Sequence, residues 1–261
     1  MRAALITGAS GGIGEAFARR LASDGRSLVL VARSENKLRS ICDEIQTKHN
    51  VTAQFVGADL TSPEAEKQVF EGTEKLGLEI DLLINNAGFG SMGDFSGLPL
   101  ERELGMIDLN IRCLVALTHR YLKGMRERKS GTIINVSSAA GFQPIPFMAT
   151  YAATKAFVTS FSEAIAEENR PYGIQVLALC PGSTETNFHA SAGIDRAMGF
   201  KGQETAENVV ETTMRAIGTG RAKIVSGWTN WLVASAVNVL PNSLITRAMA
   251  KGMRGRFQDN K

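Results

Sequence analysis

Short apolar runs alternate with longer amphipathic segments along most of the chain, up to about residue 226. We expect strands at residues 3–7, 27–32, 51–57, 82–85, 131–137, 174–180 and 222–226. Helical spacing of apolar residues occurs between them, at residues 13–23, 35–48, 63–76, 101–128, 152–170 and 206–217. Runs such as residues 28–31 are apolar on both sides, which is typical of parallel strands covered by helices on both faces. The alternation therefore predicts an α/β fold with a doubly wound parallel sheet, in which ligands bind at the carboxyl ends of the strands.

The size and composition of the chain fit one packed domain. With 261 residues, 44% of them hydrophobic and 21% charged, the chain can form one core, and no linker or internal repeat divides residues 1–261. The formal net charge is only +3 and no long block of like charge is present, so no nucleic-acid partner is expected. The three cysteines and three histidines are scattered and match no metal-ligand spacing, so no metal site is expected.

The sequence has neither a signal-like leader nor a long apolar stretch. Its first residues lead directly into a strand-like run, whereas a signal peptide would place a charged segment and an apolar segment there. A run of about eighteen apolar residues, enough to span a bilayer, occurs nowhere. A cytoplasmic location is therefore expected.

Two regions interrupt the alternation. Residues 183–202 are rich in small and polar residues, and we expect a long loop that acts as a substrate lid. Residues 228–261 are expected to form a helical C-terminal extension with basic residues at 247–256. The residues of its candidate apolar face are Trp228, Trp231, Leu232, Val233, Val237 and Leu240. A cover for the substrate cleft or a subunit interface is favoured for this extension over a position on a membrane surface.

Residues 7–14 are rich in glycine and lie between the first expected strand and the first expected helix. In a Rossmann-type dinucleotide fold, Gly8 would allow a tight turn and Gly12 would let a pyrophosphate approach the backbone. Gly14 would let the helix pack against the strand, and the N–H groups of the first helical turn would face the anion. The segment therefore predicts a dinucleotide site, although its spacing is G-x-x-x-G-x-G rather than G-x-G-x-x-G.

The end of the second expected strand indicates which nicotinamide dinucleotide is bound. An acidic residue there would accept hydrogen bonds from the 2′-hydroxyl of NAD, but the sequence has Arg33 and no acid until Glu35. A planar, permanently charged guanidinium suits a 2′-phosphate. NADP(H) is therefore the preferred cofactor, while glycine at position 11, where a second basic residue could have helped, leaves NAD(H) possible.

Four polar residues are candidates for catalysis. Tyr151 and Lys155 are four residues apart in a helical segment, so they share one face. A nearby ammonium and a positive nicotinamide ring would lower the pKa of a phenol, which could then exchange a proton with a carbonyl oxygen. Ser138 follows an expected strand and could stabilise the developing oxyanion, while the adjacent Ser137 could cap a turn. Asn110 is a polar residue within an apolar helical run.

These segments together resemble the short-chain dehydrogenase/reductase family. The Thr-Gly-x-x-x-Gly-x-Gly loop of that family matches residues 7–14, its Asn-Asn-Ala-Gly matches residues 85–88, and its Tyr-x-x-x-Lys matches residues 151–155. Its Asp-Leu matches residues 59–60, and its Pro-Gly-x-x-x-Thr matches residues 181–186. The resemblance covers roughly residues 2–226 in the order of the family.

The resemblance implies a role for each matched residue. Tyr151 would be the general acid/base, and Ser138 would polarise the carbonyl. Lys155 would bind the nicotinamide ribose and lower the pKa of Tyr151, while Asn110 would hold a water in the proton relay. The residues expected to bind the cofactor are Gly8, Ser10, Gly12, Ile13, Gly14, Arg33, Asp59, Leu60, Asn86, Ala87, Gly88, Tyr151, Lys155, Pro181, Gly182, Thr184 and Thr186. A homodimer or homotetramer formed through residues 101–128 and 152–170 is also implied.

The expected activity is the interconversion of a carbonyl and an alcohol on an apolar small molecule. Residues 89–95 and several apolar residues would close the pocket: Phe142, Pro144, Ile145, Phe147, Phe188, Met198 and Phe200. A 3-oxoacyl-thioester reductase and a non-enzymatic NADP(H)-sensing protein are the alternatives. Residues 8–14 also fit the G-x-x-G-x-x-G of epimerase-like relatives, but those relatives have a larger C-terminal substrate domain than a chain ending at Lys261 would have.

Overall fold

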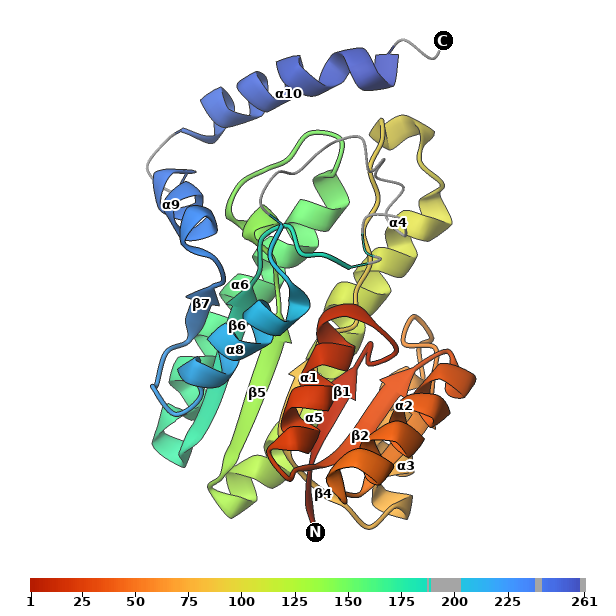
Figure 1. Ribbon diagram of the computed structural model, residues 1–261. Coiled ribbons are helices and arrows are strands. Elements are labelled where there is room, and N and C mark those ends of the chain that lie inside the picture. The colour runs from red at the N-terminus through yellow and green to blue at the C-terminus, as the bar shows by residue number, and fades with distance from the viewer. Residues whose placement is uncertain (187, 189–202, 238–240, 259–261) are drawn as a thin grey trace.

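The computed structural model describes residues 1–186, 188, 203–237 and 241–258, and its centre is one sheet of seven parallel strands (Figure 1). The strands are β1 (Arg2–Thr7), β2 (Ser27–Ala32), β3 (Ala53–Gly57), β4 (Glu79–Asn85), β5 (Gly131–Val136), β6 (Ile174–Cys180) and β7 (Lys223–Val225). Their order across the sheet is β3-β2-β1-β4-β5-β6-β7, so the direction of winding reverses between β1 and β4. Loops diverge at such a point and leave a crevice at the carboxyl ends of the strands.

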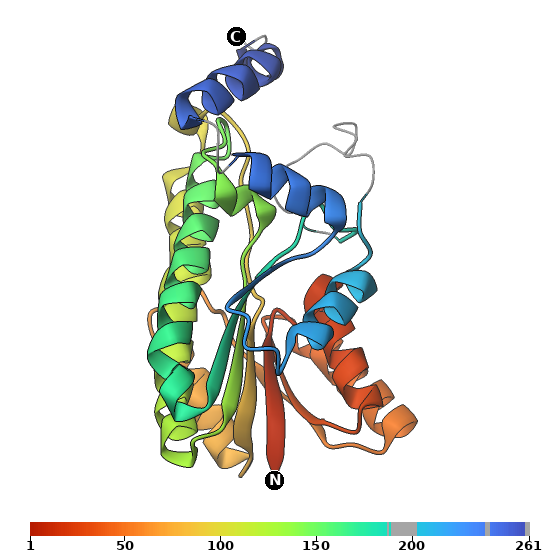
Figure 2. The ribbon, with the colours of Figure 1, turned by 90° about the vertical axis from the view of Figure 1, so that its left-hand side faces the viewer.

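Helices cover both faces of this sheet (Figure 2). One face carries α1 (Gly12–Ser23), α2 (Glu35–His49) and α8 (Ala206–Ala216), and the other carries α3 (Ala65–Lys75), α5 (Leu114–Arg128) and α6 (Ala149–Asn169). Successive side chains of one strand point to opposite faces of the sheet. In β1, Ala4 and Ile6 belong to the core cluster with Phe17 of α1, whereas Leu5 belongs to the cluster with Leu117 of α5. The predicted doubly wound fold is confirmed.

The start of β4 differs from the prediction, because the strand begins at Glu79 and not at residue 82. The charges of Glu79 and Asp81 hid this part of the strand in the sequence. Both charges are paired at the amino end of the sheet, Glu79 with Arg2 at 3.1 Å and Asp81 with Arg26. Strands β3, β5 and β7 are one or two residues shorter than predicted.

The single helix expected at residues 101–128 is broken. The structure has α4 (Leu100–Ile107), then a π-helical turn, η2 (Asp108–Cys113), and then α5. Wide turns of this kind occur mostly as local insertions in α-helices, often at functional sites. Short 3₁₀ turns occur at η1 (Phe95–Gly97), η3 (Ala139–Phe142) and η4 (Arg170–Tyr172).

The C-terminal extension contains two helices, α9 (Trp228–Val237) and α10 (Asn242–Gln258). Figures 1 and 2 show α10 at the end of the molecule farthest from the N-terminus, beyond the loops that follow the strands. Leu240 and the side chains of Val233 and Val237 lie outside the described part of the chain, as do residues 187 and 189–202 of the segment predicted as a lid. That lid stays a prediction.

Candidate active site

The glycine loop connects β1 to α1 at the carboxyl edge of the sheet. Gly8 and Gly12 have φ values of 67° and 58°, in the left-handed region that residues with a side chain rarely adopt. A Cβ atom at Gly8 would lie 2.9 Å from Cα of Ala87, and one at Gly14 would overlap the carbonyl oxygen of Gly8. The loop is therefore a surface of bare backbone that ends at the positive end of a helix, which suits a pyrophosphate.

Asn86 fixes the loop after β4 to the glycine loop. Its Nδ2 donates hydrogen bonds to the carbonyl oxygens of Thr7 and Gly8, at 2.9 and 3.3 Å. In return, Oγ1 of Thr7 accepts from the backbone N–H groups of Asn86 and Ala87, at 2.9 and 3.0 Å. The side chain of Asn86 thus shapes the cofactor site, while the backbone of residues 86–88 lies along its edge.

The residues expected to bind the adenosine end of the cofactor lie after β2 and β3. Arg33 and Asp59 are both exposed there, and the charge of Arg33 acts on Asp59. Hydrogen bonds from the backbone N–H and the hydroxyl of Thr61, at 3.0 and 2.8 Å, hold the pKa of Asp59 below its usual range. Leu60 is buried in the core, so only its backbone is available to a cofactor.

Residues 181–186 follow β6 and approach the glycine loop. The backbone N–H of Ala139 donates to the carbonyl oxygen of Pro181 at 2.8 Å, and a Cβ atom at Gly12 would lie 3.0 Å from Cγ2 of Thr186. The hydroxyl of Thr184 is buried and donates to the carbonyl oxygen of Gly182 at 3.1 Å, so this side chain serves the loop itself. Among the other predicted contacts, Ser10 is partly exposed and Ile13 packs against the core.

These observations fit a nicotinamide dinucleotide. A side chain at Gly8, Gly12 or Gly14 would fill the cradle, and positive φ values exclude ordinary residues at the first two. The exposed guanidinium of Arg33 provides a cation at the end of β2. The backbone of residues 8–14 would hold the pyrophosphate, and residues 86–88 and 181–186 would line the nicotinamide half.

Tyr151 lies in the first turns of α6, where it meets Ser138. The hydroxyl of Ser138 forms a hydrogen bond with Tyr151, and its Oγ also accepts from the N–H of Ala140 at 3.1 Å. Ser137 points elsewhere: its hydroxyl donates to the carbonyl oxygen of Lys155 and contacts Oγ1 of Thr159, both at 2.7 Å. Ser138, and not Ser137, is therefore the serine that lies beside the tyrosine hydroxyl.

Burial controls the protonation of Tyr151 and Lys155. It raises the pKa of Tyr151 to about 12, against the opposing effect of the hydrogen bond with Ser138, and it lowers the pKa of Lys155 to about 8. The structure does not show the lowering of the Tyr151 pKa expected from Lys155: burial disfavours the phenolate and raises the pKa, and the effect that lowers it is the hydrogen bond with Ser138. Nζ of Lys155 donates to the carbonyl oxygen of Val136 at 2.9 Å and lies 5.8 Å from the ring centroid of Tyr151.

Asn110 lies in the π-helical turn with its side chain buried. Its Nδ2 donates to the carbonyl oxygen of Phe89 and to Oγ1 of Thr154, each at 3.1 Å, and its Oδ1 accepts from the N–H of Phe89 at 3.2 Å. A Cβ atom at Gly88 would lie 3.0 Å from Oδ1 of Asn110 and 3.3 Å from Nζ of Lys155. The structure thus brings Asn110, Ser138, Tyr151 and Lys155 to one place.

Thr154 is a site residue that the sequence analysis missed. It is buried, receives the hydrogen bond from Asn110 and donates to the carbonyl oxygen of Tyr151 at 2.8 Å. It therefore connects the π-helical turn to the helix that carries the tyrosine. The available signal was a hydroxyl three residues after Tyr151, on the face that also carries Lys155.

An apolar wall adjoins the tyrosine. Its buried members are Met106, Met148 and Tyr151, with Phe89, Met92, Ala140, Ile145 and Phe188 packed against them. The rings of Tyr151 and Phe188 lie 5.2 Å apart. Of the predicted pocket residues, Ile145 and Phe188 therefore border the tyrosine, while Met198 and Phe200 lie outside the described residues.

Phe142 and Pro144 line a separate cavity of about 530 Å³. This cavity lies between residues 141–146, the first half of α6 and the start of α10, and Ile145 borders both it and the apolar wall. Phe147 has a φ of 66° and its ring stacks on Phe257 of α10 at a centroid distance of 4.6 Å. Residues 142–147, which were predicted to line one pocket, are thus divided between this cavity and the apolar wall beside Tyr151.

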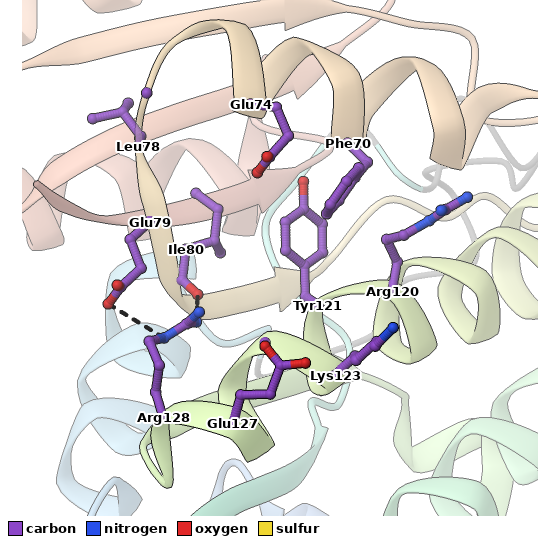
Figure 3. A pocket seen from close by; sticks show the side chains of 12 residues that line it. Phe70, Glu74, Leu78, Glu79, Ile80, Arg120, Tyr121, Lys123, Glu127 and Arg128 are labelled. Carbon is purple, nitrogen blue, oxygen red and sulfur yellow. Dashed lines mark hydrogen bonds and ion pairs between the residues drawn. The ribbon is translucent and has the colours of Figure 1, made fainter.

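A cavity of about 670 Å³ lies between α3, the start of β4 and α5, away from the catalytic residues (Figure 3). Two of its polar side chains pair with neighbours: Arg128 with Glu79 at 3.3 Å and with the carbonyl oxygen of Ile80 at 3.1 Å, and Tyr121 with Thr73 at 2.9 Å. The described residues contain no cluster of three metal-ligating side chains and no helix long and apolar enough to cross a membrane.

The glycine cradle at the reversal of strand order, with a serine, a tyrosine and a lysine beside it, defines the class of protein: an oxidoreductase that uses a nicotinamide dinucleotide to interconvert alcohols and carbonyls. The family model described as short chain dehydrogenase matches residues 2–197, and the chain belongs to this family. The very-long-chain 3-oxoacyl-CoA reductase of Mus musculus is 31% identical over 261 residues, which cover 97% of this chain and 81% of the mouse protein.

Solved structures agree over nearly the whole chain. A 7beta-hydroxysteroid dehydrogenase superposes with a TM-score of 0.87 at 29% identity and covers 95% of this chain and 96% of its own. A short-chain dehydrogenase from Sphingobium yanoikuyae, solved in complex with NADPH, gives a TM-score of 0.81 at 30% identity, over 94% of this chain and 95% of its own. The fold and the enzyme family predicted from the sequence are confirmed.

Proposed function

We propose that this protein reduces the carbonyl group of a bulky apolar substrate with NADPH, and oxidises the corresponding alcohol in the reverse direction. The observation that carries the proposal is the meeting of Ser138, Tyr151 and Lys155 beside an apolar wall. A carbonyl oxygen between Ser138 and Tyr151 would leave its apolar substituents against the partly exposed Met92, Ile145 and Phe188.

When bound, the dinucleotide supplies a hydride to the carbonyl carbon. The hydroxyl of Ser138 donates a hydrogen bond to the carbonyl oxygen and holds it beside Tyr151. Tyr151, protonated at neutral pH because its pKa is about 12, gives its proton to that oxygen as the alcohol forms. The ammonium of Lys155 stabilises the phenolate that remains and would bind the ribose hydroxyls of the cofactor. Asn110 holds Phe89 and Thr154 in place through its side-chain amide.

The preference for NADP(H) rests on Arg33. Its side chain is exposed at the end of β2, and the next acid, Glu35, lies against Gly57. The NADPH complex of the Sphingobium relative supports the same cofactor. We expect the ratio of kcat/KM for NADPH to that for NADH to exceed one and to fall by about tenfold or more in Arg33→Asp, since one charge-assisted contact is lost.

Arg215→Asp is the matched control for this measurement, because it makes the same charge change at an exposed position on α8. It should leave the ratio unchanged. A wild-type enzyme that prefers NADH would sink the assignment of NADP(H).

Two substrate classes follow from the apolar wall and the relatives. The similarity to a 7beta-hydroxysteroid dehydrogenase favours a polycyclic ketone, and the similarity to a very-long-chain 3-oxoacyl-CoA reductase favours a 3-oxoacyl thioester as the second candidate. NADPH oxidation measured over ketosteroids, bulky ketones and 3-oxoacyl-CoA thioesters of increasing length separates them. The class with the highest kcat/KM identifies the substrate, and turnover confined to small charged acids would refute both.

We also infer a homodimer or homotetramer formed through the helices around residues 100–128 and 149–169. Leu100, Leu104 and Ile107 of α4 are exposed, and so is Phe157 of α6. Because α4 packs against α6, these side chains supply apolar surface that a second copy could cover.

A further inference from the structure

The C-terminal arm, defined as α9 and α10, projects from the carboxyl end of the sheet (Figures 1 and 2). Phe257 of α10 stacks on Phe147, and Asn242 and Thr246 border the cavity of about 530 Å³. Three further residues of α10 are partly buried at a spacing of four, which places them on one side of the helix: Ile245, Met249 and Met253. The arm therefore has one side toward the body of the protein and one side toward solvent.

The solvent side of α10 is positively charged. Arg247, Lys251 and Arg254 are exposed at a spacing of four and three residues, which places them on one face. Residues 242–258 contain no aspartate or glutamate. None of the three cations forms an ion pair with a residue that the structure describes. Three neighbouring cations thus face solvent without a carboxylate.

The same arm carries large exposed apolar side chains. Trp228 and Trp231, the two tryptophans of the chain, are 76% and 57% exposed, and Leu232 is 48% exposed. Leu244 of α10 is 57% exposed and lies one turn before Arg247, on the charged face. Tryptophan and leucine next to lysine and arginine are typical of segments that lie at the interface of a membrane.

We propose that the C-terminal arm binds the surface of an anionic lipid bilayer. Lipid phosphates and anionic headgroups would neutralise Arg247, Lys251 and Arg254, while the acyl region would receive Trp228 and Leu244. A second copy of this chain fits the charged face less well. If a second copy covered the three cations, they would be buried without ion-pair partners unless that copy supplied carboxylates, and the arm itself has none.

The test is flotation of the full-length protein with phosphatidylcholine vesicles that contain or lack phosphatidylserine. We expect binding to the anionic vesicles only, weakened by added salt. The triple variant Arg247→Glu/Lys251→Glu/Arg254→Glu should lower the partition coefficient more than about tenfold, because each cation near an anionic surface contributes to binding. The double variant Trp228→Ala/Leu232→Ala should also lower it, although the net charge stays the same.

The control triple variant is Lys48→Glu/Lys67→Glu/Lys75→Glu, which makes the same charge change at exposed positions on α2 and α3. It should keep most of the binding, and NADPH binding should show that every variant is folded. Equal loss in both triple variants would overturn the proposal, as would a wild-type protein that does not float. Loss of oligomeric mass in the arm variant without lipid, together with no flotation of the wild type, would assign the face to a second copy.

Discussion

Ser137 and Ser138 have the same side chain, but their hydroxyls have different hydrogen-bond partners. Successive residues at the end of a strand point to opposite sides, so their hydroxyls meet different partners. Ser137 is buried against α6, with its hydroxyl on the carbonyl oxygen of Lys155, and Ser138 meets Tyr151. Ser137 thereby positions the helix turn that carries Lys155. Of the two neighbouring hydroxyls, Ser137 thus supports the helix, and Ser138 is the one proposed to act on the substrate.

Replacing Tyr151 by Phe removes the proposed proton donor and its hydrogen bond with Ser138, and keeps the aromatic ring. We expect Tyr151→Phe to lower kcat by about 10²- to 10⁴-fold, the usual contribution of a general acid, while NADPH still binds. Turnover and NADPH fluorescence measure the two effects. Tyr172→Phe, at an exposed tyrosine after α6, is the matched control and should keep full activity. Retention of substantial turnover in Tyr151→Phe would refute the assigned role.

Lys155 should give the enzyme a pH limit. Its pKa is lowered to about 8, so raising the pH through that value removes the proton and the positive charge. We expect kcat/KM for NADPH, which reports groups of the free enzyme, to be level below about pH 8 and to fall above it. Lys155→Arg keeps its charge over this range and should move the decline to higher pH, even if its activity is low. If the decline of kcat/KM stays at the same pH in Lys155→Arg, a group other than Lys155 causes it.

Local elements of this protein are shaped by close backbone approach. The glycine loop has no room for side chains where it meets residues 86–87, and Asn86 holds the two loops together by its amide. The π-helical turn presents Asn110 to Phe89 and Thr154 in the same way, through one amide that bonds two segments. At these two places around the site, the side-chain amide of one asparagine thus holds two segments together.

Two glycines of one loop should respond differently to alanine. A Cβ atom at Gly14 would overlap the carbonyl oxygen of Gly8, whereas one at Gly11 would meet nothing within 4 Å. Gly11 also has extended backbone, with a φ of 168°, that alanine can adopt. We expect Gly14→Ala to lose NADPH affinity and about 1–3 kcal/mol of stability through overpacking, and Gly11→Ala to stay within about 0.5 kcal/mol. Calorimetric titration and thermal unfolding measure both, and equal behaviour would contradict the packing argument.

At the scale of the whole molecule, the sequence predicts the fold better than the fine shape of the site. The alternation of strands and helices and the spacing of Ser138, Tyr151 and Lys155 were sufficient for the architecture and the family. The early start of β4 could not be recognised in the sequence, because its two acidic residues pair with arginines that are distant in the sequence. The division of residues 142–147 between two compartments could not be predicted, because an apolar side chain suits either one.

The exposed apolar side chains on α4 should be covered in solution. If α4 and α6 form the subunit interface, Leu104→Lys/Ile107→Lys would place two charges in it and shift the protein toward monomers. Sedimentation velocity measures the shift. Leu232→Lys/Leu244→Lys on the C-terminal arm is the matched control, with two exposed leucines outside this face, and should keep the oligomeric mass. A monomeric wild type would refute the inferred assembly.

The two halves of the crevice are built from different materials. The half proposed for the cofactor presents backbone at Gly8, Gly12 and Gly14, where only glycine fits, while the half proposed for the substrate is a wall of exchangeable apolar side chains that includes Met92, Ile145 and Phe188. Random substitutions will therefore impair the protein in the first half and be tolerated in the second. A laboratory selection for a new substrate should accumulate changes on the wall and around the Phe147–Phe257 stack, and leave Gly8, Gly12 and Gly14 as they are.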